Sequence, residues 1–438
     1  MFSISPRKRN TDMRRLENEP IAIQEIIDRG LISPHFQPLV SMKKTAVVGV
    51  EGLSRGIDPR NGKLIPAPLI FREAAAKGLS RELDLLCRRK ILEDFRRLQA
   101  RFPQIILSLN IDASAIEKRI WSGYLKTQVA EAGISPSSVV IEIVESVVGD
   151  IEELEKFVES YRESGFLIAL DDVGAGHSNL NRIPLIKPDV LKIDRYLVMD
   201  IQEDFYKQEV IKSLVSMARH LGTVLIAEGV ETQAEVSTLL EMGVDIIQGF
   251  YFSKPRLLRE FECDSVREKI DELGLSFRLD QLLKVEEKRI NVKKYFSLVS
   301  EVQGALARTT SDEFENQLVK AASVFPSVEC LYVLDENGRQ MTDMVLNAAH
   351  KPGRNSPLFH PSPKGADHRI RDYYYFLMSG ELNKNSYVTK PYVSMGSGNL
   401  CVTIGSLFRD SLDRRYILCL DIHTSGFGAR VLEPAVKS

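Results

Sequence analysis

The sequence has few cysteines, a single tryptophan and no excess of charge of either sign. Its 438 residues include five cysteines, and 58 Lys and Arg residues stand against 60 Asp and Glu residues, for a formal net charge of −2. The cysteines are scattered and form no C-x-x-C pair, which disfavours a disulfide scaffold or a structural zinc site. The balanced charge excludes a basic protein that coats nucleic acid. We therefore expect reduced thiols and no DNA or RNA partner.

Long apolar runs are also missing. The N-terminal segment is basic but has no apolar core behind its charges, and no later stretch approaches the roughly 18 uncharged residues of a spanning helix. With 44% hydrophobic residues the chain can nevertheless bury a sizeable core. We expect a soluble, cytoplasmic protein that does not contact a membrane, with residues 1–19 as a flexible tail.

Short β-rich apolar runs recur between residues 36 and 253. They are FQPLV (36–40), AVVGVEGLSR (46–55), IILSLNI (105–111), VVIEIVES (139–146), FLIALDDV (166–173), VLKIDR (190–195), TVLIAEGV (223–230) and IIQGFYFS (246–253). Helices are expected between most of them, at about 67–77, 80–101, 113–131, 150–163, 203–221 and 231–242. Continuously apolar strands that alternate with helices predict a parallel sheet, and eight of them fit a (β/α)₈ TIM barrel. Only SMKKT separates the first two runs, which is too short for a crossover helix, so we expect the first strand to be antiparallel.

The composition and pattern of the sequence change after the last of these runs. Residues 259–325 are rich in helix formers and poor in turn signals, which predicts a helical connector. Residues 326–438 contain several strand-like runs around an aromatic segment, RDYYYFL, and this predicts a separate α+β domain. The expected organisation is therefore a tail, a barrel over residues 20–258, the connector and the C-terminal domain.

Polar residues lie late in the predicted strands, where barrel enzymes carry their catalytic groups. The set comprises Glu51, Asn110, Glu142, Glu145, Asp171, Asp172, Lys192, Asp194 and Glu228, and Gln248 opens the last turn. Charged groups in apolar strands are costly to bury unless they are paired or bind a metal. Because the set is rich in oxygen and contains no Cys or His, it suits Mg²⁺ or Mn²⁺ better than zinc.

Two adjacent aspartates point to the type of reaction. Successive side chains of a strand face opposite ways, so Asp171 and Asp172 share a site only if the strand ends there, and Gly174 and Gly176 supply that break. Two carboxylates on a tight turn can hold two metal ions, which activate water and neutralise a phosphoryl leaving oxygen. Singly, such acids are often structural, but the whole set would repel itself without cations. The set therefore predicts phosphodiester hydrolysis.

Residues 20–258 resemble the EAL domain, the family of cyclic-di-GMP phosphodiesterases. The matching motifs, in family order, are F-Q-P-L-V, V-E-G-L-S-R, L-N, I-E-I-V-E-S, D-D-V-G-A-G, L-K-I-D, A-E-G-V-E-T and Q-G-F-Y-F-S-K-P. The resemblance implies hydrolysis of cyclic di-GMP to linear pGpG by metal-activated water, with two Mg²⁺ or Mn²⁺ ions per active site.

The resemblance also implies a role for each matching residue. The family's metal ligands correspond to Glu51, Asn110, Glu142, Asp171 and Asp172. Lys192 would orient the nucleophilic water, Glu228 would act near it as base or support the second metal, and Glu145 would anchor the D-D-x-G-x-G loop. The positions that contact the dinucleotide correspond to Gln37, Arg55 and Gln248. The planar guanidinium of Arg55 suits a phosphate clamp.

The chain departs from the family pattern at two places. Gly52 replaces the alanine of the family signature, which adds backbone freedom but removes no ligand. The loop D-D-V-G-A-G-H-S-N differs from the family's D-D-F-G-T-G-Y-S-S, which couples metal binding to dimerisation. A catalytically weak or inactive cyclic-di-GMP receptor that signals by binding is therefore the alternative to a phosphodiesterase.

The C-terminal segment resembles PAS/Cache-type sensor modules, in which an aromatic helix covers a sheet. Its aromatic and basic side chains would either line a pocket for a small-molecule ligand or simply form the core; these are Arg371, Tyr373, Tyr374 and Tyr392. The connector carries periodic Leu, Val and Ile residues that must be buried against a domain or another chain. We therefore expect a homodimer whose C-terminal module regulates the barrel.

Overall fold

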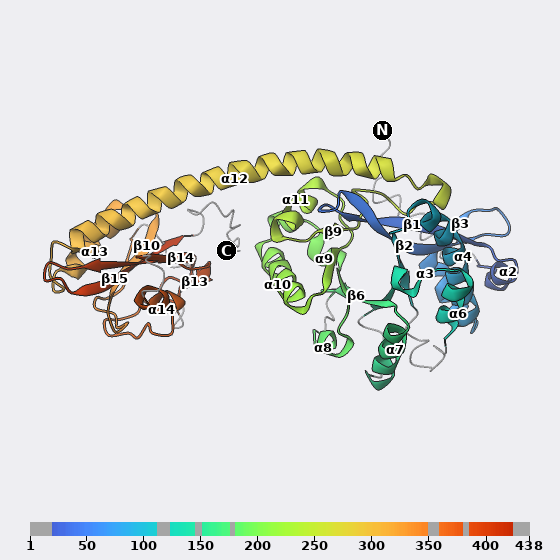
Figure 1. Cartoon of the computed structure of the whole chain (residues 1–438), viewed down its shortest axis with the longest axis horizontal. Coiled ribbons are helices and arrows are strands. Elements are labelled where there is room, and N and C mark those ends of the chain that lie inside the picture. The colour runs from blue at the N-terminus through green and yellow to red at the C-terminus, as the bar shows by residue number, and fades with distance from the viewer. Residues whose placement is uncertain are drawn as a thin grey trace. The chain divides into compact units, whose positions relative to one another are not determined.

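The computed structural model describes residues 20–111, 123–144, 151–175, 180–348, 359–379 and 385–423. The chain forms two compact units, whose boundary between Phe277 and Arg278 falls within helix α12 (Cys263–Leu306). Each unit has its own sheet (Figure 1), and each has its own hydrophobic core.

The first unit is a closed barrel of eight strands. They are β1 (Ile32–Ser41), β2 (Ala46–Ile57), β4 (Ile106–Asn110), β5 (Val139–Val144), β6 (Leu167–Val173), β7 (Val190–Ile193), β8 (Val224–Ala227) and β9 (Ile246–Ile247). The order is β1-β9-β8-β7-β6-β5-β4-β2, and β2 pairs with β1 to close the barrel. Strand β1 is antiparallel to both neighbours, whereas β2 and the later barrel strands pair in parallel. The predicted modified barrel is confirmed.

Helices surround the barrel strands (Figure 1). They are α2 (Ile23–Asp28), α3 (Ala67–Ala76), α4 (Ser80–Arg101), α6 (Tyr124–Glu131), α7 (Ile151–Glu163), α8 (Arg182–Ile186), α9 (Arg195–Val198), α10 (Phe205–Leu221) and α11 (Gln233–Met242). A short strand, β3 (Leu64–Pro66), pairs with β2 beside them. Local sequence sets the helix ends: Thr232 and Glu235 form a capping box at the start of α11, and Gly243 ends it with φ of +93°.

The second unit is an antiparallel sheet with helices on both faces. Its strands are β10 (Val328–Asp335), β11 (Val345–Leu346), β12 (Ser386–Val388), β13 (Tyr392–Val393), β14 (Leu400–Arg409) and β15 (Arg415–His423). One face packs on the last part of α12 and on α13 (Phe314–Val324), and the other packs on the aromatic helix α14 (Asp372–Met378). The predicted C-terminal α+β domain is therefore present, and its relation to PAS/Cache modules stays a prediction.

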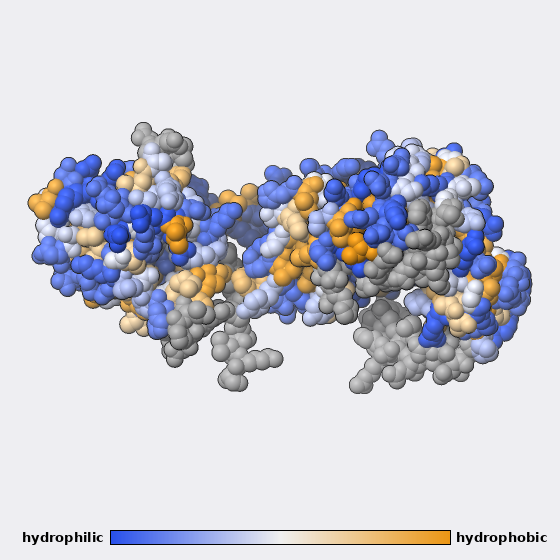
Figure 2. Space-filling model, turned by 90° about the horizontal axis from the view of Figure 1, so that it is seen from below, coloured by the Kyte–Doolittle hydropathy of each residue, from blue (hydrophilic) through white to orange (hydrophobic). Residues whose placement is uncertain are grey.

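On the face that Figure 2 shows, hydrophilic residues predominate and hydrophobic residues form patches between them. None of the described helices combines the length and the apolar character needed to cross a membrane. All five cysteines are free thiols.

Candidate active site

The interior of the barrel is layered. Its floor is a cluster of buried apolar side chains from five strands: Leu39, Val140, Ala169, Val190 and Ile226. Two residues after the last four of these come Glu142, Asp171, Lys192 and Glu228. Because side chains alternate along a strand, residues two apart face the same way, so these polar groups lie above the apolar floor. The parallel strands bring them together at their carboxyl ends.

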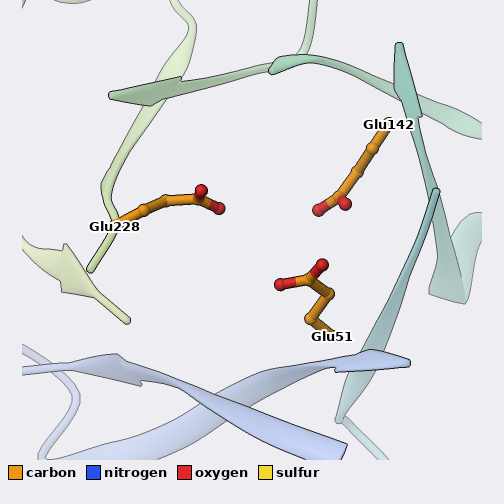
Figure 3. A group of neighbouring side chains, drawn as sticks. All are labelled: Glu51, Glu142 and Glu228. Carbon is orange, nitrogen blue, oxygen red and sulfur yellow. The ribbon is translucent and has the colours of Figure 1, made fainter. Parts of the chain in front are cut away.

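Three carboxylates face one another at the centre of this layer, as Figure 3 shows. They belong to Glu51 on β2, Glu142 on β5 and Glu228 just after β8, and one oxygen from each lies within 4.8 Å of the others. Glu142 is completely buried and Glu51 is 8% exposed. Gathering carboxylates in such a space is unfavourable unless a cation neutralises them.

Lys192 supplies part of the neutralising charge. Its Nζ atom lies 2.5 Å from Glu142 Oε1, 2.5 Å from Glu228 Oε1 and 3.5 Å from Asp171 Oδ1. Burial of this side chain, which is 1% exposed, acts to lower its pKa, but the surrounding carboxylates outweigh burial and hold the pKa well above its usual value. Lys192 is therefore a fixed cation, and the acidic groups around it outnumber it.

The acids of the cluster favour a proton or a cation. Burial raises the pKa of Glu142 and raises that of Glu228 to about 8, although the charge of Lys192 opposes both shifts. Burial also raises the pKa of Asp172, and the negative charge of Asp171 adds to this effect. These shifts reflect carboxylates whose negative charge the protein alone does not fully neutralise.

The donor set fits a divalent cation that prefers oxygen ligands. Among the described residues, Glu142 Oε2 and Gln248 Oε1 are buried and have no hydrogen-bond partner. The cluster offers carboxylate and amide oxygens, which are the ligands that Mg²⁺, Mn²⁺ and Ca²⁺ favour.

Two amide side chains hold Glu51 in place. Asn110 Nδ2 donates a hydrogen bond to Glu51 Oε1 at 2.8 Å, and Gln248 Nε2 donates to Oε2 at 2.5 Å. Gln248 Nε2 also donates to Gln37 Oε1 at 3.2 Å, and Gln37 Nε2 donates to the carbonyl of Ser253 at 3.2 Å. Three residues predicted separately as ligand or substrate positions thus form one chain of hydrogen bonds to Glu51.

The glycine after Gln248 brings this residue close to the neighbouring segment. A Cβ atom at Gly249 would lie 2.0 Å from the carbonyl oxygen of Val230. The amide of Val230 donates to the carbonyl of Gln248 at 3.2 Å, and Tyr251 donates back to Val230 at 3.0 Å. Only glycine permits this approach, which ends β9 after two residues and places Gln248 over the site.

The regular pairing of strand β6 ends before the glycines at which the sequence predicts the break. This early irregularity lets Asp171 and Asp172 approach one site. The pairing of β6 with β7 is irregular between Leu170 and Val173, and Asp172 itself has φ of +56°. The Asp172 amide donates to Asp171 Oδ1 at 2.9 Å, which compensates for part of the cost of this left-handed conformation. Gly174 follows the end of β6 with φ of +101°, a conformation that favours glycine, and a Cβ atom there would also lie 2.2 Å from Leu197 Cδ1.

Arg55 lies farther along β2 and makes a more local contact. Its Nη1 atom donates to the carbonyl of Ser54 at 2.7 Å, and the structure gives it no salt bridge to any described carboxylate. Burial lowers its pKa, and the charge of Glu51 opposes this shift. Glu145 and residues 176–179 of the D-D-V-G-A-G-H loop lie outside the described residues.

The sequence pattern did not single out Ser108, and it gave no packing reason for the glycine at position 52. The Ser108 hydroxyl, on a side chain 2% exposed, donates to Glu142 Oε1. Ser108 precedes Asn110 by two residues on β4, so the alternation of the strand was a signal that it faces the site. A Cβ atom at Gly52 would lie 2.5 Å from Ile91 Cγ2 of α4, so glycine allows this helix to pack close to the barrel.

Residues 21–255 match the EAL domain, which is more than half of the chain, and the protein therefore belongs to the EAL domain family. The probable cyclic di-GMP phosphodiesterase PdeB of Escherichia coli K12 is 30% identical over 242 residues, which are 55% of this chain and 46% of PdeB. The cyclic di-GMP phosphodiesterase RocR of Pseudomonas aeruginosa is 30% identical over 231 residues, 52% of this chain and 58% of RocR. The chain thus spans about half the length of these relatives.

A solved structure shares the fold over most of the chain. It is the Bacillus subtilis YkuI protein, which has an EAL domain and was solved in complex with the substrate c-di-GMP and calcium. The TM-score is 0.76 at 22% sequence identity, and the match covers 94% of this chain and 100% of YkuI.

Proposed function

We propose that this protein is a metal-dependent cyclic-di-GMP phosphodiesterase that hydrolyses cyclic di-GMP to linear pGpG. The observation that carries the proposal is the buried cluster in which Lys192 lies between Glu142 and Glu228 at the carboxyl ends of an EAL-family barrel. The names of PdeB and RocR and the ligand of YkuI support this choice of substrate.

The proposed metal site consists of the residues that supply oxygen atoms around the cluster. Its ligands would be Glu51, Asn110, Glu142, Asp171 and Asp172, holding two Mg²⁺ or Mn²⁺ ions. When bound, such ions polarise phosphoryl oxygens and make water a stronger nucleophile. Asn110 and Gln248 keep Glu51 oriented through the hydrogen bonds that they donate to its two oxygens.

The chain's own residues have distinct tasks in this mechanism. The raised pKa of Lys192 keeps its ammonium protonated, so it donates hydrogen bonds and orients the attacking water but does not serve as a base. Glu228 is only partly exposed and lies 2.5 Å from Lys192, so it would act near the attacking water as base or support the second metal. Arg55, with no salt bridge to a described acid, would clamp a phosphate of the dinucleotide, and Gln37 and Gln248 would contact it nearby.

The decisive experiment is to incubate the full-length protein with cyclic di-GMP and Mn²⁺ and to separate the products by chromatography. Formation of pGpG that stops when the metal is chelated supports the proposal. Absence of pGpG at any metal concentration, together with tight binding of the dinucleotide in a calorimetric titration, supports a receptor instead. The departure of the D-D-V-G-A-G-H loop from the family pattern is the observation that favours this second candidate.

We also propose that the protein is a homodimer in which the C-terminal unit acts as a sensor. The middle of α12 carries exposed leucines, including Leu275 and Leu283, which a second chain would cover. In the sheet, Asp421 accepts a hydrogen bond from Thr403 Oγ1 at 2.7 Å, and Glu329 is buried with one carboxylate oxygen that has no described hydrogen-bond partner.

These buried polar groups support a small-molecule ligand in the C-terminal unit. The aromatic residues predicted for a pocket are partly committed to internal contacts, since Tyr373 OH lies 3.0 Å from His368 Nδ1 and Arg371 lies over the ring of Tyr392.

Light scattering of the full-length protein tests the dimer, and a mass of one chain would refute it. The five free thiols agree with the reducing cytoplasm that we propose as the location.

A further inference from the structure

The two carboxylate oxygens of Glu142 have different surroundings. Oε1 accepts a hydrogen bond from the Ser108 hydroxyl and lies 2.5 Å from Lys192 Nζ. Oε2 is buried and has no hydrogen-bond partner among the described residues. Because the terminal torsion of a glutamate is broad and nearly two-fold, nothing intrinsic to the side chain distinguishes the two oxygens. The hydrogen-bond donors around the Glu142 carboxylate therefore decide which of its oxygens stays free to bind another group.

Lys192 alone does not determine which carboxylate oxygen of Glu142 stays free. Its ammonium is shared by Glu142, Glu228 and Asp171, and an ammonium is a point charge on a flexible stem that imposes little direction. The Ser108 hydroxyl is attached to a short side chain on a rigid strand, and its hydrogen bond is directed to one oxygen.

The position of Ser108 in the sheet also explains why its side chain is small. Ser108 pairs in register with Glu51 on β2 and with Val140 on β5, two residues before Glu142. It therefore lies between the strands that carry two of the three clustered carboxylates. A longer side chain at this position would project into the cluster, whereas a serine hydroxyl reaches Glu142 and occupies little space.

We infer that Ser108 is a positioning residue that occupies Glu142 Oε1 and so keeps Oε2 free to bind a divalent cation. The inference rests on the proposed metal site and adds to it a residue that sets metal affinity. Groups that orient a metal ligand in this way change metal affinity by about 10–100-fold when they are removed. Ser108 touches neither the substrate nor the reacting atoms in this account.

The test is a Mn²⁺ titration of the full-length protein in which electron paramagnetic resonance measures free Mn²⁺. We expect Ser108→Ala to bind Mn²⁺ about 10–100-fold more weakly than wild type and Ser108→Thr, which keeps the hydroxyl, to recover most of the affinity. Circular dichroism establishes that each variant is folded. A folded Ser108→Ala protein with wild-type Mn²⁺ affinity would overturn the inference, as would a wild type that binds no Mn²⁺.

Ser54→Ala is the matched control. Ser54 is also a buried serine of a barrel strand, but its hydroxyl hydrogen-bonds the Cys87 thiol of α4 on the outside of the barrel. We expect this variant to bind Mn²⁺ as wild type does, and an equal loss of affinity in both variants would count against a specific role for Ser108.

Activity measurements separate the inference from the proposed function. With cyclic di-GMP present, Ser108→Ala should need more Mn²⁺ for half-maximal turnover but should approach the wild-type kcat at saturating Mn²⁺. The direct titration contains no dinucleotide, so a wild type that binds Mn²⁺ but forms no pGpG would refute the phosphodiesterase while the comparison of variants still decides the role of Ser108.

Discussion

Replacing Lys192 by methionine should destabilise the barrel, and the cost should grow as the pH rises. Methionine has a similar length and no charge, so the change removes the ammonium that lies 2.5 Å from both Glu142 and Glu228. Removing one partner of a buried ion pair typically costs about 3–5 kcal/mol. We expect a loss of this size in the free energy of unfolding at pH 8.5, measured with chelator to exclude metal ions.

The pH dependence follows from the two glutamates. Burial raises the folded-state pKa of Glu142 and raises that of Glu228 to about 8, so the folded protein binds more protons than the unfolded chain above the ordinary carboxyl pKa. The stability contributed by such a group falls as the pH rises toward its folded-state pKa. Without Lys192 both acids become harder to ionise, so the variant should lose more stability than wild type between pH 5 and pH 8.5.

Urea unfolding monitored by circular dichroism measures this effect. Added Mn²⁺ should restore part of the stability because it replaces the lost positive charge. Equal stability of wild type and Lys192→Met at pH 8.5, or a cost that shrinks as the pH rises, would refute the assignment of Lys192 as the cation of the cluster.

Three further predictions concern catalysis, metal choice and the C-terminal unit. Glu51→Ala and Asp171→Asn should each abolish formation of pGpG by removing a proposed metal ligand, and turnover within severalfold of wild type in buffer rich in metal would contradict the site. Ca²⁺ should inhibit the Mg²⁺-supported reaction, since its ligand distances of about 2.3–2.6 Å exceed those of Mg²⁺ at about 2.0–2.1 Å; a competition assay with equal rates in both ions would reject this. Burial lowers the pKa of His368 to about 4, so the folded state binds fewer protons than the unfolded chain. The free energy of unfolding should therefore fall by up to about 3 kcal/mol as the pH falls from about 6.5 to 4. Urea unfolding of the second unit should show this slope in wild type but not in His368→Gln, and identical slopes would exclude His368 as its cause.

The barrel could be predicted because its parallel strands are buried on both faces and appear as apolar runs. The charged residues within those runs, such as Glu142 and Lys192, stand out for the same reason. Ser108 did not stand out by charge, and only its position two residues before Asn110 indicated that it faces the site. The conformation of Asp172 could not be predicted either, since the glycines that follow are the more obvious place for a chain to turn. The length of β9 depends on the close approach of Gly249 to a segment distant along the chain.

The apolar floor of the barrel limits the routes by which a ligand can enter and leave the site. Leu39, Val140, Ala169, Val190 and Ile226 close the interior beneath the polar layer. Among the described residues, this packed layer blocks passage through the bottom of the barrel, so a ligand of the polar layer enters and leaves at the carboxyl ends of the strands. A product that dissociates slowly would then block the next substrate molecule, so the rate of its departure can limit turnover even where the chemical step is fast.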